Sequence, residues 1–202
     1  MRTQKAERGT QKATTGRVVV ISGPSGVGKS TICRELVRRL DRTVLSVSAT
    51  TRPRTPAEED GKDYWFLSRE EFERRIEQGL FLEHAEVFGN LYGTPRDALD
   101  RAVRAGQTVI LEIDVQGGRQ AKRAFPGATM IFILPPDSQT LQRRLAGRGR
   151  DDQDTMRRRL AWAEQETAAA KECYDHFVVN DDLQRAIREI LEIVPGRARP
   201  AE

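Results

Sequence analysis

One short stretch of the chain combines the residue types that bind phosphate groups. Gly23 to Ser30 reads GPSGVGKS, which fits the pattern G-x-x-x-x-G-K-[S/T] of a phosphate-binding loop. Its glycines let backbone N–H groups converge on phosphate oxygens, the Lys29 ammonium neutralises the β and γ phosphates, and the Ser30 hydroxyl can ligate Mg²⁺. Because the loop follows an apolar run and opens a helical pattern, it predicts a nucleoside triphosphate site rather than a plain turn.

The segments around this loop alternate between strand and helix patterns. Residues 17–22 (RVVVIS) form an apolar, β-branched run, which predicts a buried strand, and residues 31–40 place their apolar side chains on one helical face. Further strands are expected at 45–48, from Tyr64, at 80–92 around a Gly89–Asn90 turn, and at 109–113, 130–134 and 177–179. Further helices are expected from Ser68 to Gly79, from Pro95 to Gly106, at 116–125, 138–146 and 154–172, and after Asp181. This alternation predicts an α/β fold with a three-layer, doubly wound parallel sheet of the P-loop NTPase type.

The composition limits the class of protein. The 202 residues are 38% hydrophobic and 32% charged, which is typical of a globular domain and excludes a coiled-coil rod or collagen. We expect no membrane segment, because no apolar run approaches the roughly 20 residues that cross a bilayer. Residues 1–16 lack the apolar stretch of a secretory signal, so a cytoplasmic protein is expected. The net charge is only +4, so nucleic acid is not an expected partner.

Two cysteines, Cys33 and Cys173, are far apart and lack metal-ligand spacing. We expect both to be free, small, buried or half-buried side chains. No pattern in the chain specifies an oligomeric state.

The phosphate-binding loop alone leaves several classes of nucleotide-binding protein open. GTPases, motor ATPases and small-molecule kinases share it. A GTPase would usually show an N-K-x-D-like segment late in the chain, whereas residues 179–182 read VNDD. Residues 50–94 instead predict a small mixed lobe inserted in the main fold, and an Arg-rich segment follows the strand at 130–134. This organisation is typical of nucleoside monophosphate kinases, which have an acceptor lobe and a lid.

A series of segments is similar to one family, in the order of that family. They read SGPSGVGKST, SVSATTR at 46–52, DGKDYWF at 60–66, FLEHAEVFGNLYGTP at 81–95, LEIDVQG at 111–117, IFILPP at 131–136, LAGRG at 145–149 and VVNDD at 178–182. Together they resemble the guanylate kinases over about residues 17–194. The resemblance implies transfer of the ATP γ-phosphoryl group to GMP, and also to dGMP, with ATP and GMP as small-molecule substrates and Mg²⁺ as the cofactor.

The resemblance also implies a division of the chain. The guanylate kinase-like domain would span residues 17–196, between a disordered basic tail of residues 1–16 and a frayed end of residues 197–202. Within it we expect a core of residues 17–49 and 95–196, a GMP-binding lobe of residues 50–94, and a lid at about 146–158.

The chemistry of guanine agrees with four residues that the resemblance assigns to the acceptor base. Guanine presents an O6 acceptor beside N1–H and N2–H₂ donors, so a selective pocket needs hydroxyl donors and carboxylate acceptors. The resemblance places the hydroxyls at Ser48 and Thr94 and the carboxylates at Glu83 and Asp114. These are the required chemical types.

The acceptor phosphate needs positive charge and donors that hold it in line with the γ-phosphate of ATP. The resemblance assigns this phosphate to Arg52, Tyr64 and Tyr92, and it also includes Glu58 among the GMP-binding residues. Family chains typically have a second arginine three residues after the first, but here that position is Thr55 and the arginine is Arg54. We predict that Arg54 still reaches the phosphate, because a loop flanked by prolines can rotate locally.

On the donor side, the resemblance assigns ATP to the phosphate-binding loop, the start of the following helix and one residue near the adenine. These residues are Gly23, Pro24, Ser25, Gly26, Val27, Gly28, Lys29, Ser30, Thr31 and Asn180. The catalytic residues would be Lys29, Arg52, Arg148 and Arg159, the last two as lid arginines that close over the phosphates. Glu112 ends an apolar strand near the loop, where family chains commonly have Asp.

Two other functions are compatible with parts of this pattern. A kinase of a phosphorylated ribose would share the loop and the lid but would lose the guanine-reading set, which this chain retains. A non-catalytic interaction module of the guanylate-kinase-like type would have a degraded loop, whereas Gly28, Lys29 and Ser30 are intact here.

Overall fold

The computed structural model describes residues 16–146 and 153–194. The predicted tail up to residue 15, the lid residue Arg148 and the predicted frayed end at 197–202 lie outside these described residues. Among the described residues, no helix is both long and apolar enough to cross a membrane.

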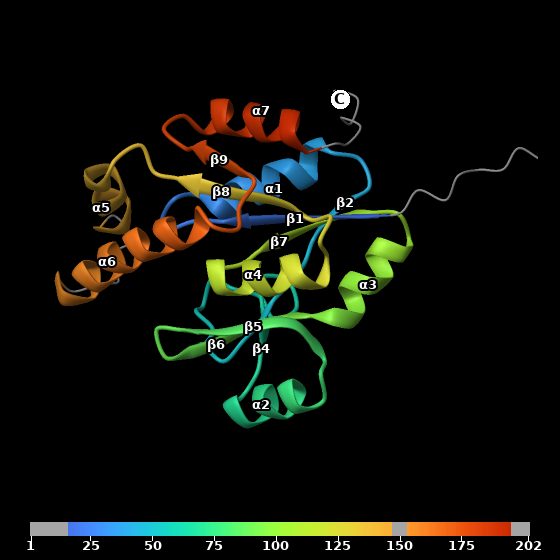
Figure 1. The fold of residues 1–202 in the computed structure, drawn as a ribbon. Helices are drawn as coiled ribbons and strands as arrows, with labels where there is room; N and C mark the ends of the chain where they lie inside the picture. The colour runs from blue at the N-terminus through green and yellow to red at the C-terminus, as the bar shows by residue number, and fades with distance from the viewer. Residues whose placement is uncertain (1–15, 147–152, 195–202) are drawn as a thin grey trace, which may run out of the picture.

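In the described part of the chain, five parallel strands form the central sheet (Figure 1). From one edge to the other they are β2 (Thr43–Leu45), β7 (Thr108–Glu112), β1 (Arg17–Ser22), β8 (Thr129–Leu134) and β9 (His176–Val179). β1 lies in the centre, where Ile21 pairs with Glu112 on one side and with Ile131 on the other. Because all five strands run in the same direction, the loops that follow them meet at one edge of the sheet.

Helices cover both faces of this sheet, so the predicted three-layer α/β fold is confirmed. One face carries α1 (Lys29–Arg39) and α7 (Leu183–Ile193). The other face carries α3 (Arg96–Arg104), α4 (Val115–Ala124) and the end of α6 (Gln153–Ala170). Helix α5 (Ser138–Ala146) packs against α6. Along β1, Val19 and Ile21 belong to the first core and Val18 and Val20 to the second. Burial on both faces is why this strand is apolar at successive positions.

A second, smaller sheet lies beyond α4, in the lower half of Figure 1. Its strands are, in order, β4 (Trp65–Phe66), β3 (Ala49–Thr50), β6 (Asn90–Pro95) and β5 (Phe81–Val87), and all of its pairs except β3–β4 are antiparallel. Helix α2 (Arg69–Glu77) packs on this sheet, with the Phe72 ring stacked 4.4 Å from that of Phe81. Ser68 caps α2 by accepting a hydrogen bond from the Glu71 N–H, as their spacing predicts.

The strand predicted at 45–48 is wrong, because the chain changes sheets there. The Ser46 N–H still donates to Ile110 O of the central sheet, whereas Ser48 O accepts from the Trp65 N–H of the second sheet. β2 therefore ends before this crossing and β3 begins after it. A short apolar segment does not show which of two sheets it joins.

Among the boundaries that differ from the prediction by one residue are the β5–β6 turn and the start of α3. The β5–β6 turn is Phe88–Gly89 rather than Gly89–Asn90, because Asn90 already pairs with Val87 in the strand ladder. Pro95, predicted as the first helical residue, is instead the last residue of β6 and the N-cap of α3.

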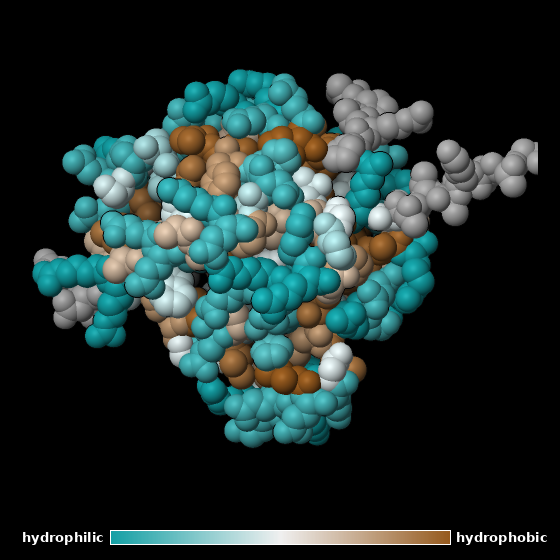
Figure 2. Space-filling view, viewed as in Figure 1, coloured by the Kyte–Doolittle hydropathy of each residue, from teal (hydrophilic) through white to brown (hydrophobic). Residues whose placement is uncertain are grey.

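Polar side chains lie mostly on the surface and apolar ones mostly in the interior, as the composition of a globular domain predicts. Figure 2 shows hydrophilic residues over most of this face, with apolar residues gathered in bands between the helices and the sheets. Cys33 is buried and Cys173 is half-buried, and both are free thiols, so the expectation for them is confirmed.

Candidate active site

A cleft of about 300 Å³ opens where the carboxyl ends of the central strands face the second sheet and helix α6. Thirteen of the residues predicted to bind nucleotide line it: Gly23, Ser25, Gly26, Gly28, Lys29, Ser30, Thr31, Ser48, Tyr64, Glu83, Tyr92, Asp114 and Arg159. The fold therefore brings together segments from most of the chain. Asn180 and Val27 lie at an adjoining hollow beside Gly28 and Thr31.

The phosphate-binding loop joins the end of β1 to the start of α1. Gly28 has φ +101°, and a side chain there would meet the Asn180 amide at 2.6 Å, so this position requires glycine. Asn180 itself donates a hydrogen bond of 2.7 Å to Val27 O. Lys29 Nζ donates to Gly23 O at 2.6 Å and to Pro24 O at 3.2 Å, which keeps the ammonium within the loop.

Oxygen atoms suited to Mg²⁺ lie at the end of this loop. The Ser30 hydroxyl donates to Glu112 Oε1 at 2.6 Å, across from the loop at the end of β7. No group of three or more His, Cys, Asp or Glu side chains that could hold a metal ion occurs in residues 16–146 and 153–194. A hydroxyl and one carboxylate nevertheless fit Mg²⁺, which takes few protein ligands and completes its shell with phosphate oxygens and water.

The two predicted base-reading carboxylates lie on β5 and at the N-cap of the neighbouring helix α4. Glu83 is 4% exposed and accepts a hydrogen bond of 2.6 Å from the Thr94 hydroxyl, and burial raises the pKa of Glu83 to about 7. A Cβ on Gly117 would lie 2.3 Å from Glu83 Oε2, so only glycine lets α4 approach this carboxyl so closely.

The two carboxyl oxygens of Asp114 differ in their hydrogen bonding. Oδ1 accepts from the Gly117 N–H at 2.7 Å and caps α4. Oδ2 is buried and has no hydrogen-bond partner among the described residues. Burial also raises the pKa of Asp114. A buried oxygen without a partner is costly in an empty site, so it indicates a place for a ligand donor.

The predicted phosphate-binding residues form one cluster on the far side of the cleft. The Arg52 guanidinium lies 5.6 Å from the Tyr64 ring centroid, and the Tyr64 and Tyr92 rings meet edge to face at 6.0 Å. Burial raises the pKa of Tyr64 to about 12, so its hydroxyl stays a donor at neutral pH. Arg54 lies outside this cluster, exposed, and donates to the backbone oxygen of Glu58 at 3.3 Å.

Glu58 binds Arg52 rather than facing the cleft. Its two oxygens accept from the Arg52 guanidinium at 2.5 and 3.1 Å, and one of them also accepts from the Thr55 N–H and hydroxyl. The Arg52 hydrogen bond, with those of Thr55, lowers the pKa of Glu58 to about 2. An ionised carboxylate would repel a phosphate, so we interpret Glu58 as the residue that holds Arg52 in place.

Comparison with known proteins agrees with this geometry. The family model of guanylate kinase matches residues 15–196. The chain belongs to the guanylate kinase family. It is 50% identical to the guanylate kinase of Rubrobacter xylanophilus over 89% of this chain and 93% of that one, and 51% identical to that of Thermosynechococcus vestitus over 85% and 90%. The crystal structure of guanylate kinase from Anaplasma phagocytophilum is similar in fold, with a TM-score of 0.74 and 37% identity over 89% of this chain and 85% of that chain.

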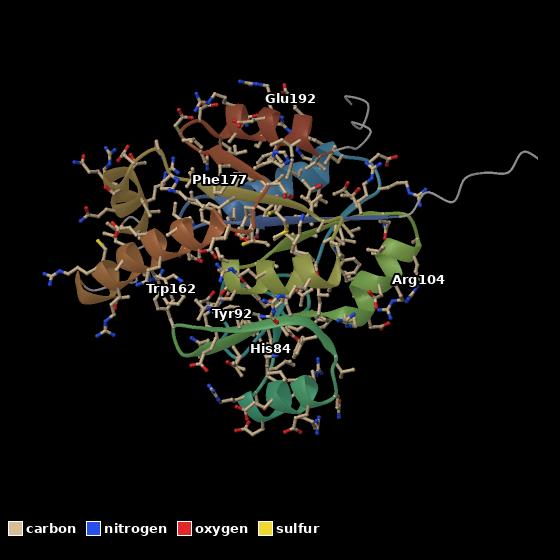
Figure 3. The ribbon with its side chains drawn as sticks, in the orientation of Figure 1. His84, Tyr92, Arg104, Trp162, Phe177 and Glu192 are labelled. Atoms are coloured by element: carbon tan, nitrogen blue, oxygen red, sulfur yellow. The ribbon has the colours of Figure 1, made fainter. Side chains whose placement is uncertain are left out.

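Among the cleft residues that the sequence of this guanylate kinase family member did not single out are Phe88, Trp162 and Glu166. Trp162 and Glu166 follow Arg159 at helical spacing, so the three share one face of α6. Burial raises the pKa of Glu166 to about 7. Figure 3 shows Trp162 extending from α6 toward the tip of the β5–β6 hairpin. The spacing on α6 could have predicted two of them, but nothing local indicated Phe88.

Proposed function

We propose that this chain transfers the γ-phosphoryl group of ATP to GMP, giving ADP and GDP. One observation carries the proposal: buried carboxylates suited to guanine open into the same cleft as the phosphate-binding loop. Membership of the guanylate kinase family supports the same reaction. Neither a phosphorylated ribose as acceptor nor a non-catalytic role has an observation in its favour.

The base would be read by hydrogen bonds that adenine cannot make. Glu83 and the unpartnered Asp114 Oδ2 would accept from guanine N1–H and N2–H₂. Thr94 donates its hydroxyl hydrogen to Glu83, so we assign guanine O6 to the Ser48 hydroxyl. Adenine would turn its N1 acceptor toward a carboxylate, and the repulsion between them would reject it.

The phosphates would be held from both sides of the cleft. Arg52, Tyr64 and Tyr92 would bind the acceptor phosphate. Whether Arg54 also contacts this phosphate is tested by the Arg54→Ala variant below. Lys29 and the loop N–H groups would bind ATP, with Asn180 bracing the loop, and Arg159 and Arg148 would neutralise charge on the transferring group. Phosphoryl transfer depends mainly on such positioning and charge neutralisation, so no acid–base pair is required.

The Mg²⁺ site would use Ser30 and Glu112. When bound, Mg²⁺ supplies positive charge to the β and γ phosphates. Glu112 already accepts the Ser30 hydrogen bond, so this pair holds its oxygens at the mouth of the loop before any nucleotide arrives.

A substrate panel tests the proposal. ATP is supplied with GMP, dGMP, AMP, CMP or UMP, and ADP formation is measured in a coupled assay. We expect turnover with GMP and dGMP, and at most a trace with the other three. Lys29→Ala should lower kcat by roughly 10²-fold or more, because the ammonium stabilises the transition state, whereas Lys171→Ala, which changes an exposed lysine that does not line the cleft, should not. Equal rates with AMP and GMP would exclude the assignment.

A further inference from the structure

Phe88 has two features that are unusual together. It is 51% exposed, although it is a large apolar side chain. It also has φ +49°, in the left-handed region that favours glycine and asparagine and that costs energy for a bulky residue. Turns of this kind usually contain Asn-Gly, so neither burial nor turn formation explains a phenylalanine here.

The Phe88 ring contacts helix α6 across the mouth of the cleft. Its centroid lies 6.0 Å from that of Trp162, and the Arg159 guanidinium lies over it at 5.6 Å. Arg159 Nη1 is in turn 3.4 Å from the Ser25 hydroxyl in the phosphate-binding loop. One aromatic ring at the tip of the hairpin therefore connects the second sheet, α6 and the phosphate-binding loop.

The same hairpin carries the acceptor-reading residues at its other positions. Glu83 lies on β5, and Tyr92 and Thr94 lie on β6, where Glu83 pairs directly with Thr94. Backbone pairing continues from these residues to Val87 and Asn90, next to the tip. A ladder that is paired up to its turn moves as one unit, so a ligand that fixes the base of the hairpin also fixes its tip.

We infer that Phe88 is a positioning residue for Arg159. The hairpin that binds the acceptor nucleotide would then also hold in place the arginine that neutralises charge on the donor phosphates. The inference rests on the proposed function and extends it. The ring face attracts the guanidinium and restricts where it lies, and a flexible arginine held in this way loses less conformational freedom when the transition state forms. The position of Arg159 beside the phosphates then depends on the position of the hairpin that carries the acceptor site.

The sharpest variant is Phe88→Asn. Asparagine is favoured at φ +49°, so the turn should be as stable as before or more stable, while the ring that faces Arg159 is lost. We expect kcat to fall by roughly 2- to 30-fold, the range of a cation–π contact, with the KM for GMP changed less than kcat. Phe88→Tyr keeps a ring and should stay close to the wild-type kcat. Leu80→Ala removes a similarly exposed apolar side chain at the opposite end of β5 and should leave kcat unchanged.

A double-mutant cycle with Arg159→Ala shows whether Phe88 acts through Arg159. Once Arg159 is absent, Phe88→Asn should cause no further loss of kcat. The inference would be overturned if the losses of kcat in the two single variants multiplied in the double variant, or if Phe88→Asn kept the wild-type kcat. It would also be overturned if the urea midpoint of Phe88→Asn fell far enough to account for the lost activity. Wild-type turnover in Arg159→Ala would remove the role of Arg159, and with it this inference, while leaving the kinase activity itself in place.

A measurement without nucleotide separates this inference from the proposed function. Trp162 becomes the sole tryptophan in a Trp65→Phe background, since the chain has 2 tryptophans. Phe88→Asn should then shift Trp162 emission to longer wavelength, because the indole loses the ring that covers it, whereas Leu80→Ala should not. An unchanged spectrum would show that the contact does not form and would overturn the inference, whatever reaction the enzyme catalyses.

Discussion

Glu83→Gln should change how the free energy of unfolding depends on pH. The Glu83 carboxyl is buried, and its pKa of about 7 in the folded chain lies above the usual value of 4.5 that it regains on unfolding. Between these two pKa values the folded chain holds the proton and the unfolded chain releases it, so the contribution of Glu83 to stability is full below pH 4.5 and is lost as the pH rises from there through 7. The separation corresponds to about 3 kcal/mol, lost by about pH 8.

Glutamine keeps the oxygen that accepts the Thr94 hydrogen bond but does not ionise. Urea unfolding without nucleotide, at several pH values between about 5 and 8, measures the difference between wild type and variant. We expect Glu83→Gln to gain stability over wild type by up to about 3 kcal/mol as the pH rises over this range. Glu86→Gln, at an exposed position of the same strand, is the matched control. A difference between Glu83→Gln and wild type that does not change with pH would refute the reasoning.

Three further changes probe other contacts. Arg54→Ala should raise the KM for GMP several-fold if the displaced arginine reaches the acceptor phosphate, and an unchanged KM in steady-state kinetics would leave that contact without a role. Glu58→Gln should have the opposite pH behaviour to Glu83→Gln: the pKa of Glu58 is lowered to about 2 by its hydrogen bonds, so the loss of stability in urea unfolding should be full above pH 4.5 and should disappear as the pH falls toward 2. Tyr174→Phe removes a buried 2.5 Å hydrogen bond to the Ser22 hydroxyl and should lower the free energy of unfolding by about 1 kcal/mol, whereas no change in the urea midpoint would show that the bond contributes nothing.

Local patterns in the sequence were enough for the phosphate-binding loop and most of the elements. The positions of the glycines and Lys29 are set within one strand–loop–helix unit, whose backbone path depends on neighbours along the chain. Helix α5 and strand β1 begin and end at the predicted residues, because an apolar helical face and a continuous apolar run each report burial directly. Resemblance to a family added the chemical types of the acceptor site.

Tertiary structure decided how the site residues act on one another. Nothing local shows that the Glu58 carboxylate is used by Arg52, that Gly117 allows α4 to approach Glu83, or that Phe88 reaches Arg159. How close these side chains lie in space depends on where the chain crosses from the central sheet to the second sheet. One such crossing lies between β2 and β3. The pKa values of the buried carboxyls have the same origin, because burial of a side chain is a property of the packed elements around it.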